Sequence, residues 1–221
     1  MISRYGDHPS QVAELFEPAG EPRGTAVLIH GGFWRAAYDR HLMDGLCRDL
    51  ATRGWFAWNL EYRRLGDGGG WPETFEDVEA GIRAIRASNT VLLAIGHSAG
   101  GHLALWAAAR GLVTRAVSQA GVVDLAEGSR LGLSRGVVDE LVPPELYARA
   151  SPAAMLPLGV PHLLVHGDED ETVPVEMSHA YHAAAVEAGD DVTLVTLPGM
   201  GHHEHLDPTS EAWLAVVEWL P

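Results

Sequence analysis

The sequence predicts an α/β domain built on a doubly wound, mainly parallel sheet with helices on both faces. Two observations lead to this prediction. Short apolar runs alternate along the chain with longer segments of helical periodicity. The apolar runs are almost continuous, which is typical of parallel strands buried on both faces of a sheet. Strands and helices in this order are joined by right-handed crossovers, and we expect the chemistry at the carboxyl ends of the strands.

Seven runs are expected to form strands. Six of them are typical of parallel strands and cover residues 25–29, 55–60, 91–95, 116–119, 162–165 and 192–197. Residues 12–16 alternate more strongly between apolar and polar side chains, which favours an antiparallel edge strand.

Six helices are expected between and after these strands, at residues 39–52, 74–88, 99–110, 137–148, 175–188 and 210–220. Thr74 and Asp77 have the spacing of a capping box. Gly54, Gly111 and Gly189 stand where the chain leaves a helix. Neither a linker nor an internal repeat divides the sequence, so residues 1–221 are expected to form one domain.

The composition is ordinary for a globular enzyme and argues against two kinds of partner. Fifteen Lys and Arg residues stand against 30 Asp and Glu residues, a formal net charge of −15 that disfavours a nucleic-acid surface. No apolar run approaches the roughly 18 residues of a membrane span, and residues 1–11 lack the apolar core of a secretory signal. The single cysteine, Cys47, fits a buried helical position. We therefore expect a cytoplasmic protein without nucleic-acid or membrane partners, and a homodimer stays open.

A nucleophile motif lies at the end of the third buried run. Residues 96–100 read Gly-His-Ser-Ala-Gly, directly after the run 91–95 and at the start of the helical segment 99–110. A sharp strand-to-helix turn of this kind holds the serine in a strained conformation with its hydroxyl exposed, and the glycines leave room for the close crossing. A serine that only caps the helix is the alternative. The context favours Ser98 as a nucleophile.

A glycine pair follows the first buried run, where residues 30–34 read HGGFW. Acyl transfer creates an oxyanion that needs two preset donors, and backbone N–H groups serve this purpose. We expect one donor from Ala99, the residue after the nucleophile, and the other from Gly32 or Phe33. A simple tight turn is the alternative. The nearby nucleophile motif favours an oxyanion loop.

The acid and base of a catalytic triad are expected in the loops after the last two strands. Residues 168–171 are four consecutive acids after the strand 162–165, and Asp170 is the preferred acid, with Asp168 second. A Gly-Met-Gly turn after the last strand leads to His202 and His203, of which His202 is the preferred base. The order serine, aspartate, histidine differs from those of chymotrypsin and subtilisin.

With these residues the chain resembles the α/β-hydrolases over essentially its whole length. More narrowly, it resembles the small esterases and arylformamidases, including kynurenine formamidases, whose oxyanion loop reads H-G-G-x-W. The segments 5–7 (YGD), 15–18 (LFEP), 61–65 (EYRRL) and 71–72 (WP) also look like that group. A tyrosine is common in kynurenine formamidases where Phe33 stands here. The segment 124–151, where larger members of the group insert a cap, is short, so we expect a minimal cap.

The resemblance implies hydrolysis of small carboxylic esters through an acyl-enzyme intermediate, or of an aryl formamide such as N-formylkynurenine, without a metal or organic cofactor. Phe33, Trp34 and Trp71 are expected to wall the mouth of the site and to contact the substrate. Together with the short cap, these rings favour a small acyl group.

Two other interpretations remain. Residues 202–205 (HHEH) could bind a metal, but they lack the helical i, i+4 spacing of a zinc motif, and we expect no metal. A catalytically inactive hydrolase fold that serves as a binding module is the alternative of a different class. It is disfavoured because every expected site position carries a competent residue.

Overall fold

Eight strands form one sheet in the computed structural model, which describes residues 1–85 and 91–221. Their order is β1-β2-β4-β3-β5-β6-β7-β8. The strands are β1 (Ile2–Arg4), β2 (Val12–Phe16), β3 (Gly24–Ile29), β4 (Trp55–Leu60), β5 (Leu92–His97), β6 (Arg115–Gln119), β7 (His162–Gly167) and β8 (Val192–Leu197). Strands β4, β3, β5, β6, β7 and β8 pair in parallel, whereas β2 pairs antiparallel with both β1 and β4. The mainly parallel sheet is confirmed.

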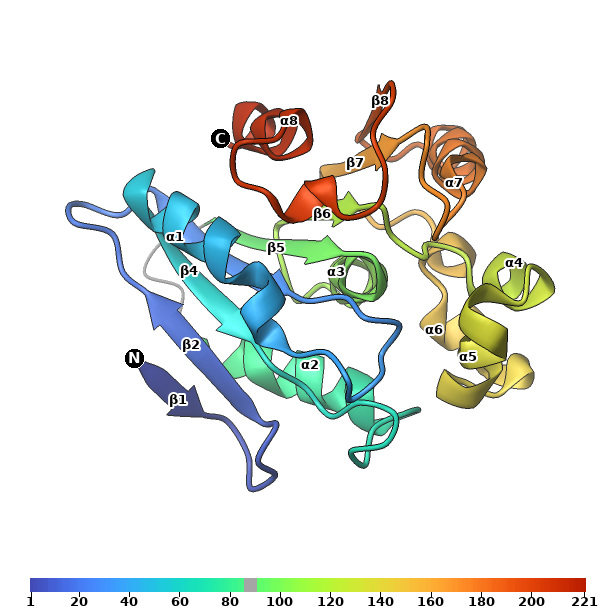
Figure 1. Cartoon of the computed structure of the whole chain (residues 1–221), viewed down its shortest axis with the longest axis horizontal. Coiled ribbons are helices and arrows are strands. Elements are labelled where there is room, and N and C mark those ends of the chain that lie inside the picture. Colours follow the sequence, from blue (N-terminus) through green and yellow to red (C-terminus); the bar gives the residue numbers. More distant parts are fainter. Residues whose placement is uncertain (86–90) are drawn as a thin grey trace.

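Helices cover both faces of the sheet, as Figure 1 shows. One face packs against α1 (Asp44–Thr52) and α8 (Glu211–Trp219). The other packs against α2 (Glu73–Ala84), α3 (Ala99–Ala109) and α7 (Val175–Glu187). The smaller helices are α4 (Leu125–Arg130), α5 (Leu133–Leu141) and α6 (Tyr147–Ala150). Short 3₁₀ helices are η1 (Arg40–Met43), η2 (Pro144–Leu146), η3 (Pro152–Met155) and η4 (Glu204–Leu206).

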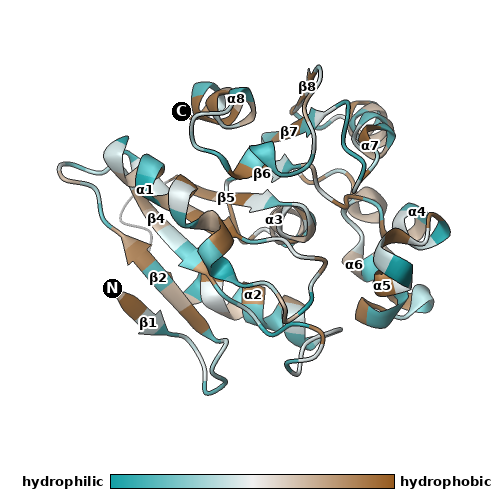
Figure 2. Ribbon diagram, in the orientation of Figure 1, coloured by the Kyte–Doolittle hydropathy of each residue, from teal (hydrophilic) through white to brown (hydrophobic). Residues whose placement is uncertain are grey.

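The central strands have continuous apolar runs because each face contributes to a separate core. In β3, Ala26 and Leu28 pack in the core under α1 and α8, whereas Val27 and Ile29 pack in the core under α2 and α3. Successive side chains of a strand point to opposite faces, so both sets must be apolar. The apolar segments of these strands lie between the two helical layers (Figure 2). Each fully buried Leu or Ile contributes roughly 1.5–3 kcal/mol to folding.

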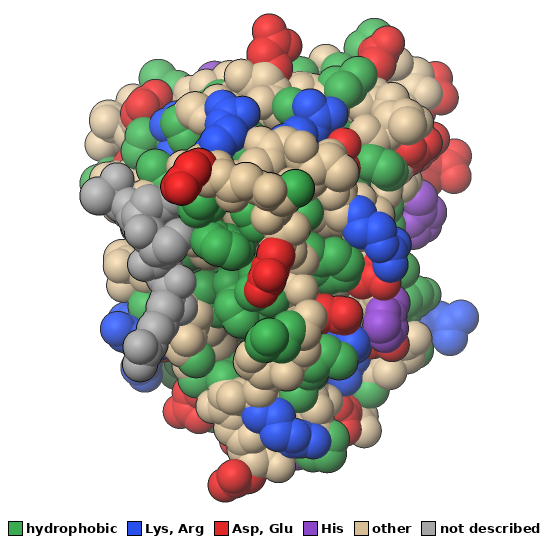
Figure 3. Space-filling model, turned by 90° about the vertical axis from the view of Figure 1, so that its left-hand side faces the viewer, with side chains coloured by type: hydrophobic (Ala, Val, Ile, Leu, Met, Phe, Trp, Pro, Cys, Tyr) green, Lys and Arg blue, Asp and Glu red, His purple; other side chains and the backbone are tan. Residues whose placement is uncertain are grey.

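The antiparallel edge differs from the prediction. Val12–Phe16 forms an antiparallel strand as expected, but it lies inside the sheet because β1 covers its outer side. A strand of three residues is too short to produce a periodic signal, so the sequence pattern missed β1. The face at this edge carries hydrophobic side chains interspersed with acidic and basic ones (Figure 3).

Helix α2 is not capped in the expected way. The Thr74 hydroxyl donates to the Arg63 carbonyl at 2.7 Å and accepts the Gly70 N–H at 3.0 Å, while the Asp77 carboxylate binds Arg63. These two side chains therefore tie the helix to the preceding loop, and the capping-box prediction is wrong. The helix predicted at 74–88 ends at Ala84, and residues 86–88 lie outside the described residues.

The helix ends at glycines were predicted correctly. Gly54, Gly111 and Gly189 have φ values of +89°, +66° and +85°, the left-handed conformation that follows a helix C-terminus.

The segment after β6 contains a small helical cap instead of the single helix predicted at 137–148. Helix α5 ends at Leu141, and two prolines at 143 and 144 stop it because a proline lacks the N–H that continues a helix. Helix α6 then begins at Tyr147. Helices α4, α5 and α6 lie together at one end of the molecule (Figure 1).

The position of the single cysteine was predicted correctly. Cys47 is fully buried among the residues of α1. Within residues 1–85 and 91–221, no helix is long and apolar enough to cross a membrane.

Candidate active site

The nucleophile motif forms a sharp turn between β5 and α3. Ser98 has φ +56° and ψ −119°, a conformation that L residues rarely adopt. A Cβ atom on Gly96 would lie 1.9 Å from the Gly100 carbonyl oxygen, and one on Gly100 would lie 1.9 Å from the Ile29 carbonyl oxygen. Only glycine fits at these two crossings, so the turn requires both glycines of the motif.

The loops after β7 and β8 meet at Asp170. Its Oδ2 atom lies 2.7 Å from His202 Nδ1. An ionised carboxylate only accepts hydrogen bonds, so Nδ1 carries the proton and the lone pair of the imidazole is on Nε2. His202 and Ser98 line the same cavity. The structure therefore brings the predicted nucleophile, base and acid together.

The Asp170 carboxylate is fully covered and accepts four hydrogen bonds. Besides His202, it accepts from His166 Nε2 at 3.1 Å and from the N–H groups of Thr172 and Val173 at 2.8 and 2.9 Å. Burial opposes ionisation of this carboxyl, but the bonds from His166, His202 and Val173 outweigh burial and hold its pKa well below the ordinary value. Asp170 is therefore a carboxylate at neutral pH.

The alternative acid and base lie differently. Asp168 is exposed, and its Oδ1 accepts the Gly199 N–H at 2.7 Å, so it braces the turn that precedes His202. His203 is exposed at the cavity lining, and its ring centroid lies 5.3 Å from that of His202. In this geometry the partner of Asp170 is His202.

His97 connects the nucleophile turn to the base. Its Nε2 donates to the His202 carbonyl oxygen at 2.8 Å. Burial, followed by the neighbouring His202, lowers the pKa of His97 well below its usual range, so the ring is neutral. This bond holds the loop after β8 against the end of β5.

The expected oxyanion loop packs directly against the nucleophile. A Cβ atom on Gly31 would lie 2.9 Å from Ser98 Cβ. Gly32, Phe33 and Trp34 have consecutive φ values of +100°, +51° and +54°. These residues form a tight turn in which the Arg35 N–H donates to the Gly32 carbonyl oxygen at 3.0 Å. Ala99 begins α3 on the other side of Ser98.

A cavity of about 240 Å³ opens over Ser98. Its lining comprises Gly32, Phe33, Tyr38, Leu42, His97, Ser98, Thr172, His202, His203 and Leu206. This is below the lower end of the volumes of roughly 300–1,000 Å³ that are common for ligand pockets.

Two of the three predicted substrate-binding rings are not in this cavity. Trp34 is fully buried and packs edge-on against His102, so it cannot contact a substrate at the mouth. Trp71 lines a different pocket, of about 420 Å³, with Phe75 and Trp106. Of the three rings, the cavity over Ser98 contains only Phe33. Both tryptophans lie in glycine-containing loops, and local sequence does not reveal which way such loops turn.

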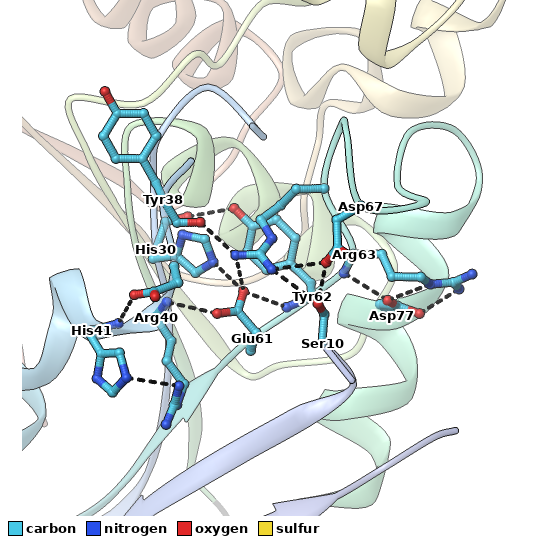
Figure 4. Close-up of polar contacts among 12 residues, drawn as sticks. Ser10, His30, Tyr38, Arg40, His41, Glu61, Tyr62, Arg63, Asp67 and Asp77 are labelled. Atoms are coloured by element: carbon cyan, nitrogen blue, oxygen red, sulfur yellow. Dashed lines mark hydrogen bonds and ion pairs between the residues drawn. The ribbon is translucent and has the colours of Figure 1, made fainter. Parts of the chain in front are cut away.

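Two polar groups near the site were not singled out from the sequence. One is His166, which contacts Asp170 from the end of β7. The other is Glu61, which follows β4 directly and contacts His30 of the HGGFW loop at 2.8 Å (Figure 4). In both cases the sequence signal that could have found the residue was a histidine or carboxylate at the carboxyl end of a buried strand.

Among the described residues, no group of three or more His, Cys, Asp and Glu side chains could hold a metal.

The chain matches the sequence model of the prolyl oligopeptidase family over residues 60–219. This range contains Ser98, Asp170 and His202, whereas the HGGFW loop precedes it. No curated protein sequence matches the chain.

Solved structures share the fold over nearly the whole chain. A truncated carbohydrate esterase from gut microbiota has a TM-score of 0.85 at 20% identity, over 98% of this chain and 93% of that one. Butyrate-bound esterase 2 of Thermogutta terrifontis has a TM-score of 0.79 at 22% identity, over 99% and 90%. The same esterase phosphonylated by sarin has a TM-score of 0.81 at 21% identity, over 99% and 91%.

Proposed function

The chain belongs to the prolyl oligopeptidase family within the α/β-hydrolase superfamily, and we propose that it is a serine esterase that cleaves small carboxylic esters. One observation carries the proposal: His202, which is bonded to Asp170, lines the same cavity as a serine in a strained strand-to-helix turn. Strained backbone persists where the surrounding structure enforces it, and such sites are often catalytic.

In the proposed mechanism Ser98 Oγ attacks the ester carbonyl while His202 Nε2 takes its proton. Asp170 holds the imidazole in the correct tautomer and stabilises the imidazolium. The N–H groups of Ala99 and of Gly32 or Phe33 bind the oxyanion of the tetrahedral intermediate. His202 returns the proton to the departing alcohol. Water then attacks the acyl-enzyme with His202 again as base, and the acid and free Ser98 are released.

The size of the cavity supports a small acyl group. A volume of about 240 Å³, walled by Phe33, Leu42 and Leu206, has room for a short chain. The similar structures that are described as esterases, one of them with butyrate bound, support the same substrate class.

An aryl formamide is the second candidate substrate. It is favoured by the HGGFW sequence of the oxyanion loop, which resembles that of arylformamidases, and by Phe33 at the cavity, where an aromatic leaving group could stack. The same nucleophile, base and oxyanion donors serve both reactions.

A direct comparison of substrates tests the proposal. The values of kcat/KM are measured for p-nitrophenyl acetate, p-nitrophenyl butyrate, N-formylkynurenine and a prolyl p-nitroanilide peptide, with Ser98→Ala as the blank. We expect the two esters to be turned over fastest. Preference for the formamide would favour the second candidate, and preference for the peptide would contradict both.

A further inference from the structure

A buried polar network lies beneath the oxyanion loop, and Glu61 is its centre (Figure 4). The Glu61 side chain is only 6% exposed. Its Oε1 lies 2.8 Å from His30 Nε2, 3.1 Å from the Tyr62 N–H nitrogen and 3.1 Å from Arg64 Nη1. Its Oε2 accepts the Arg40 N–H at 3.0 Å. Burial opposes ionisation, but the contacts with His30, Arg40 and Arg64 outweigh it and lower the pKa of Glu61.

Both ring nitrogens of His30 face oxygen atoms that accept hydrogen bonds. Nε2 faces the Glu61 carboxylate, and Nδ1 lies 2.8 Å from the Gly31 carbonyl oxygen. A neutral imidazole has one donor and one acceptor, whereas the imidazolium has two donors. Only the doubly protonated ring satisfies both contacts. The Tyr62 ring stacks on this ring, with centroids 4.5 Å apart and planes at 16°, and the Tyr62 hydroxyl donates to the His30 carbonyl at 2.8 Å.

The oxyanion loop needs such an anchor because its backbone is strained. Phe33 and Trp34 both have positive φ values, which side chains with a Cβ atom rarely adopt. His30 joins this loop to β3. Its Nδ1 contacts the Gly31 carbonyl oxygen within the loop, and its own carbonyl oxygen accepts the Tyr62 hydroxyl. A shift of His30 would move Gly31, which packs on Ser98.

We propose that Glu61 is a positioning residue that holds His30 as an imidazolium and thereby fixes the oxyanion loop against Ser98. This inference rests on the proposed function, since it assigns the loop to oxyanion binding. Glu61 does not touch the substrate. It acts through His30, and its loss should affect the stabilisation of the transition state more than substrate binding.

The neighbouring carboxylate of Asp77 offers a matched control. Its side chain is 1% exposed and binds Arg63 Nε and Nη2 at 2.8 and 2.7 Å, the Arg63 N–H at 2.9 Å and Gln11 Nε2 at 2.7 Å. It is therefore a buried, multiply bonded acid in the same part of the molecule (Figure 4). None of these contacts reaches residues 30–34.

The test compares Glu61→Gln with Asp77→Asn in ester hydrolysis. We expect Glu61→Gln to lower kcat by about 10²-fold, the scale of one lost oxyanion donor, with KM changed less than about threefold. Binding of a trifluoromethyl ketone, which forms an oxyanion on the serine, should weaken in parallel. Asp77→Asn should keep kcat within about twofold of wild type, even where it lowers stability. Equal effects of the two variants, or an unchanged kcat in Glu61→Gln, would overturn the proposal.

Two further measurements keep the outcome decisive. If Glu61→Gln does not fold, His30→Gln removes the imidazolium through which Glu61 acts. A kcat lowered about 10²-fold with KM changed less than about threefold supports the proposal, while an unchanged kcat overturns it. Nitrogen-15 NMR of His30 in the wild-type protein is independent of activity. Two protonated ring nitrogens are expected, and a neutral ring overturns the proposal even if the esterase activity stands. A wild-type protein without ester hydrolysis would instead refute the proposed function.

Discussion

Asp170 Oδ2 accepts the Nδ1 proton of His202 at 2.7 Å and at the same time lies 3.1 Å from Nε2 of His166. His166 is held in turn by Ser178 Oγ, 2.7 Å from its Nδ1. Both histidines thus meet at one carboxylate oxygen, while the other oxygen, Oδ1, accepts the N–H groups of Thr172 and Val173. This arrangement distinguishes Asp170 from the three acids around it in the sequence.

The two candidate acids should differ strongly when each is replaced. Asp170→Asn should lower kcat by about 10³–10⁴-fold, because an amide cannot hold His202 in the required tautomer. Asp168→Asn should change kcat by less than about tenfold, since Asp168 contacts only the turn before His202. Steady-state kinetics on p-nitrophenyl acetate, with circular dichroism to verify folding, measures both. An equal or larger loss for Asp168→Asn would refute the assignment of the acid.

A side chain at Gly32 should impair catalysis. Gly32 has φ +100°, and a Cβ atom there would lie 2.4 Å from Tyr38 Cβ. Gly32→Val should therefore displace the loop N–H groups and lower kcat by about 10²–10³-fold with a smaller effect on KM. Gly66→Ala is the control, because Gly66 also has a positive φ of +88° but a Cβ atom there would make only an ordinary contact, 3.7 Å from Ala36 Cβ. Comparable losses of kcat in the two variants would place the oxyanion hole elsewhere.

Acid should destabilise the fold through buried neutral histidines. Burial lowers the pKa of His102 from 6.5 to about 4. Between pH 4 and pH 6.5 the unfolded chain binds a proton at His102 that the folded protein does not. The contribution of the neutral His102 ring to the free energy of unfolding is therefore complete above pH 6.5 and is lost as the pH falls toward 4.

Urea unfolding between pH 4 and pH 7 measures this effect. His102→Gln keeps a donor toward the Ala150 carbonyl, and it should reduce the loss of stability on acidification by about 3 kcal/mol. His179→Gln, at an exposed position, should leave the pH dependence unchanged. Identical pH profiles for wild type and His102→Gln would contradict the buried, neutral state of this ring.

The small cavity should limit the length of the acyl chain. Hydrolysis of p-nitrophenyl esters should fall steeply beyond about six to eight acyl carbons, because the cavity is at the small end of ligand pockets. Leu206→Ala, which removes a wall of the cavity, should shift the preference to longer chains. Leu214→Ala, at a position of α8 that is 48% exposed, should not. Rates that stay level from acetate to palmitate would refute the small acyl site.

The strands could be predicted, and the three proposed catalytic residues could be singled out, because their signals are local. A strand buried on both faces carries a continuous apolar run; Ser98 follows such a run directly, and Asp170 and His202 lie in the loops that follow β7 and β8. The strand boundaries at Trp55–Leu60 and Val192–Leu197 were predicted correctly, the second although β8 is an edge strand with two exposed residues.

The features that were missed depend on contacts between distant residues. Glu61 and His30 are 31 residues apart and meet only because β3 and β4 are neighbours in the sheet. Trp34 was expected at the mouth, but the turn of the loop places it in the core. The broken helix after Leu141 could have been predicted, since residues 143 and 144 are both proline.

Covalent labelling of Ser98 tests the central claim most directly. The wild-type protein is treated with a fluorophosphonate, and the modified peptide is identified by mass spectrometry alongside Ser98→Ala and His202→Ala. We expect one label per chain, located on Ser98, with no label in Ser98→Ala and much slower labelling in His202→Ala. Labelling on another residue, or a wild-type protein that does not react while it is folded, would contradict it.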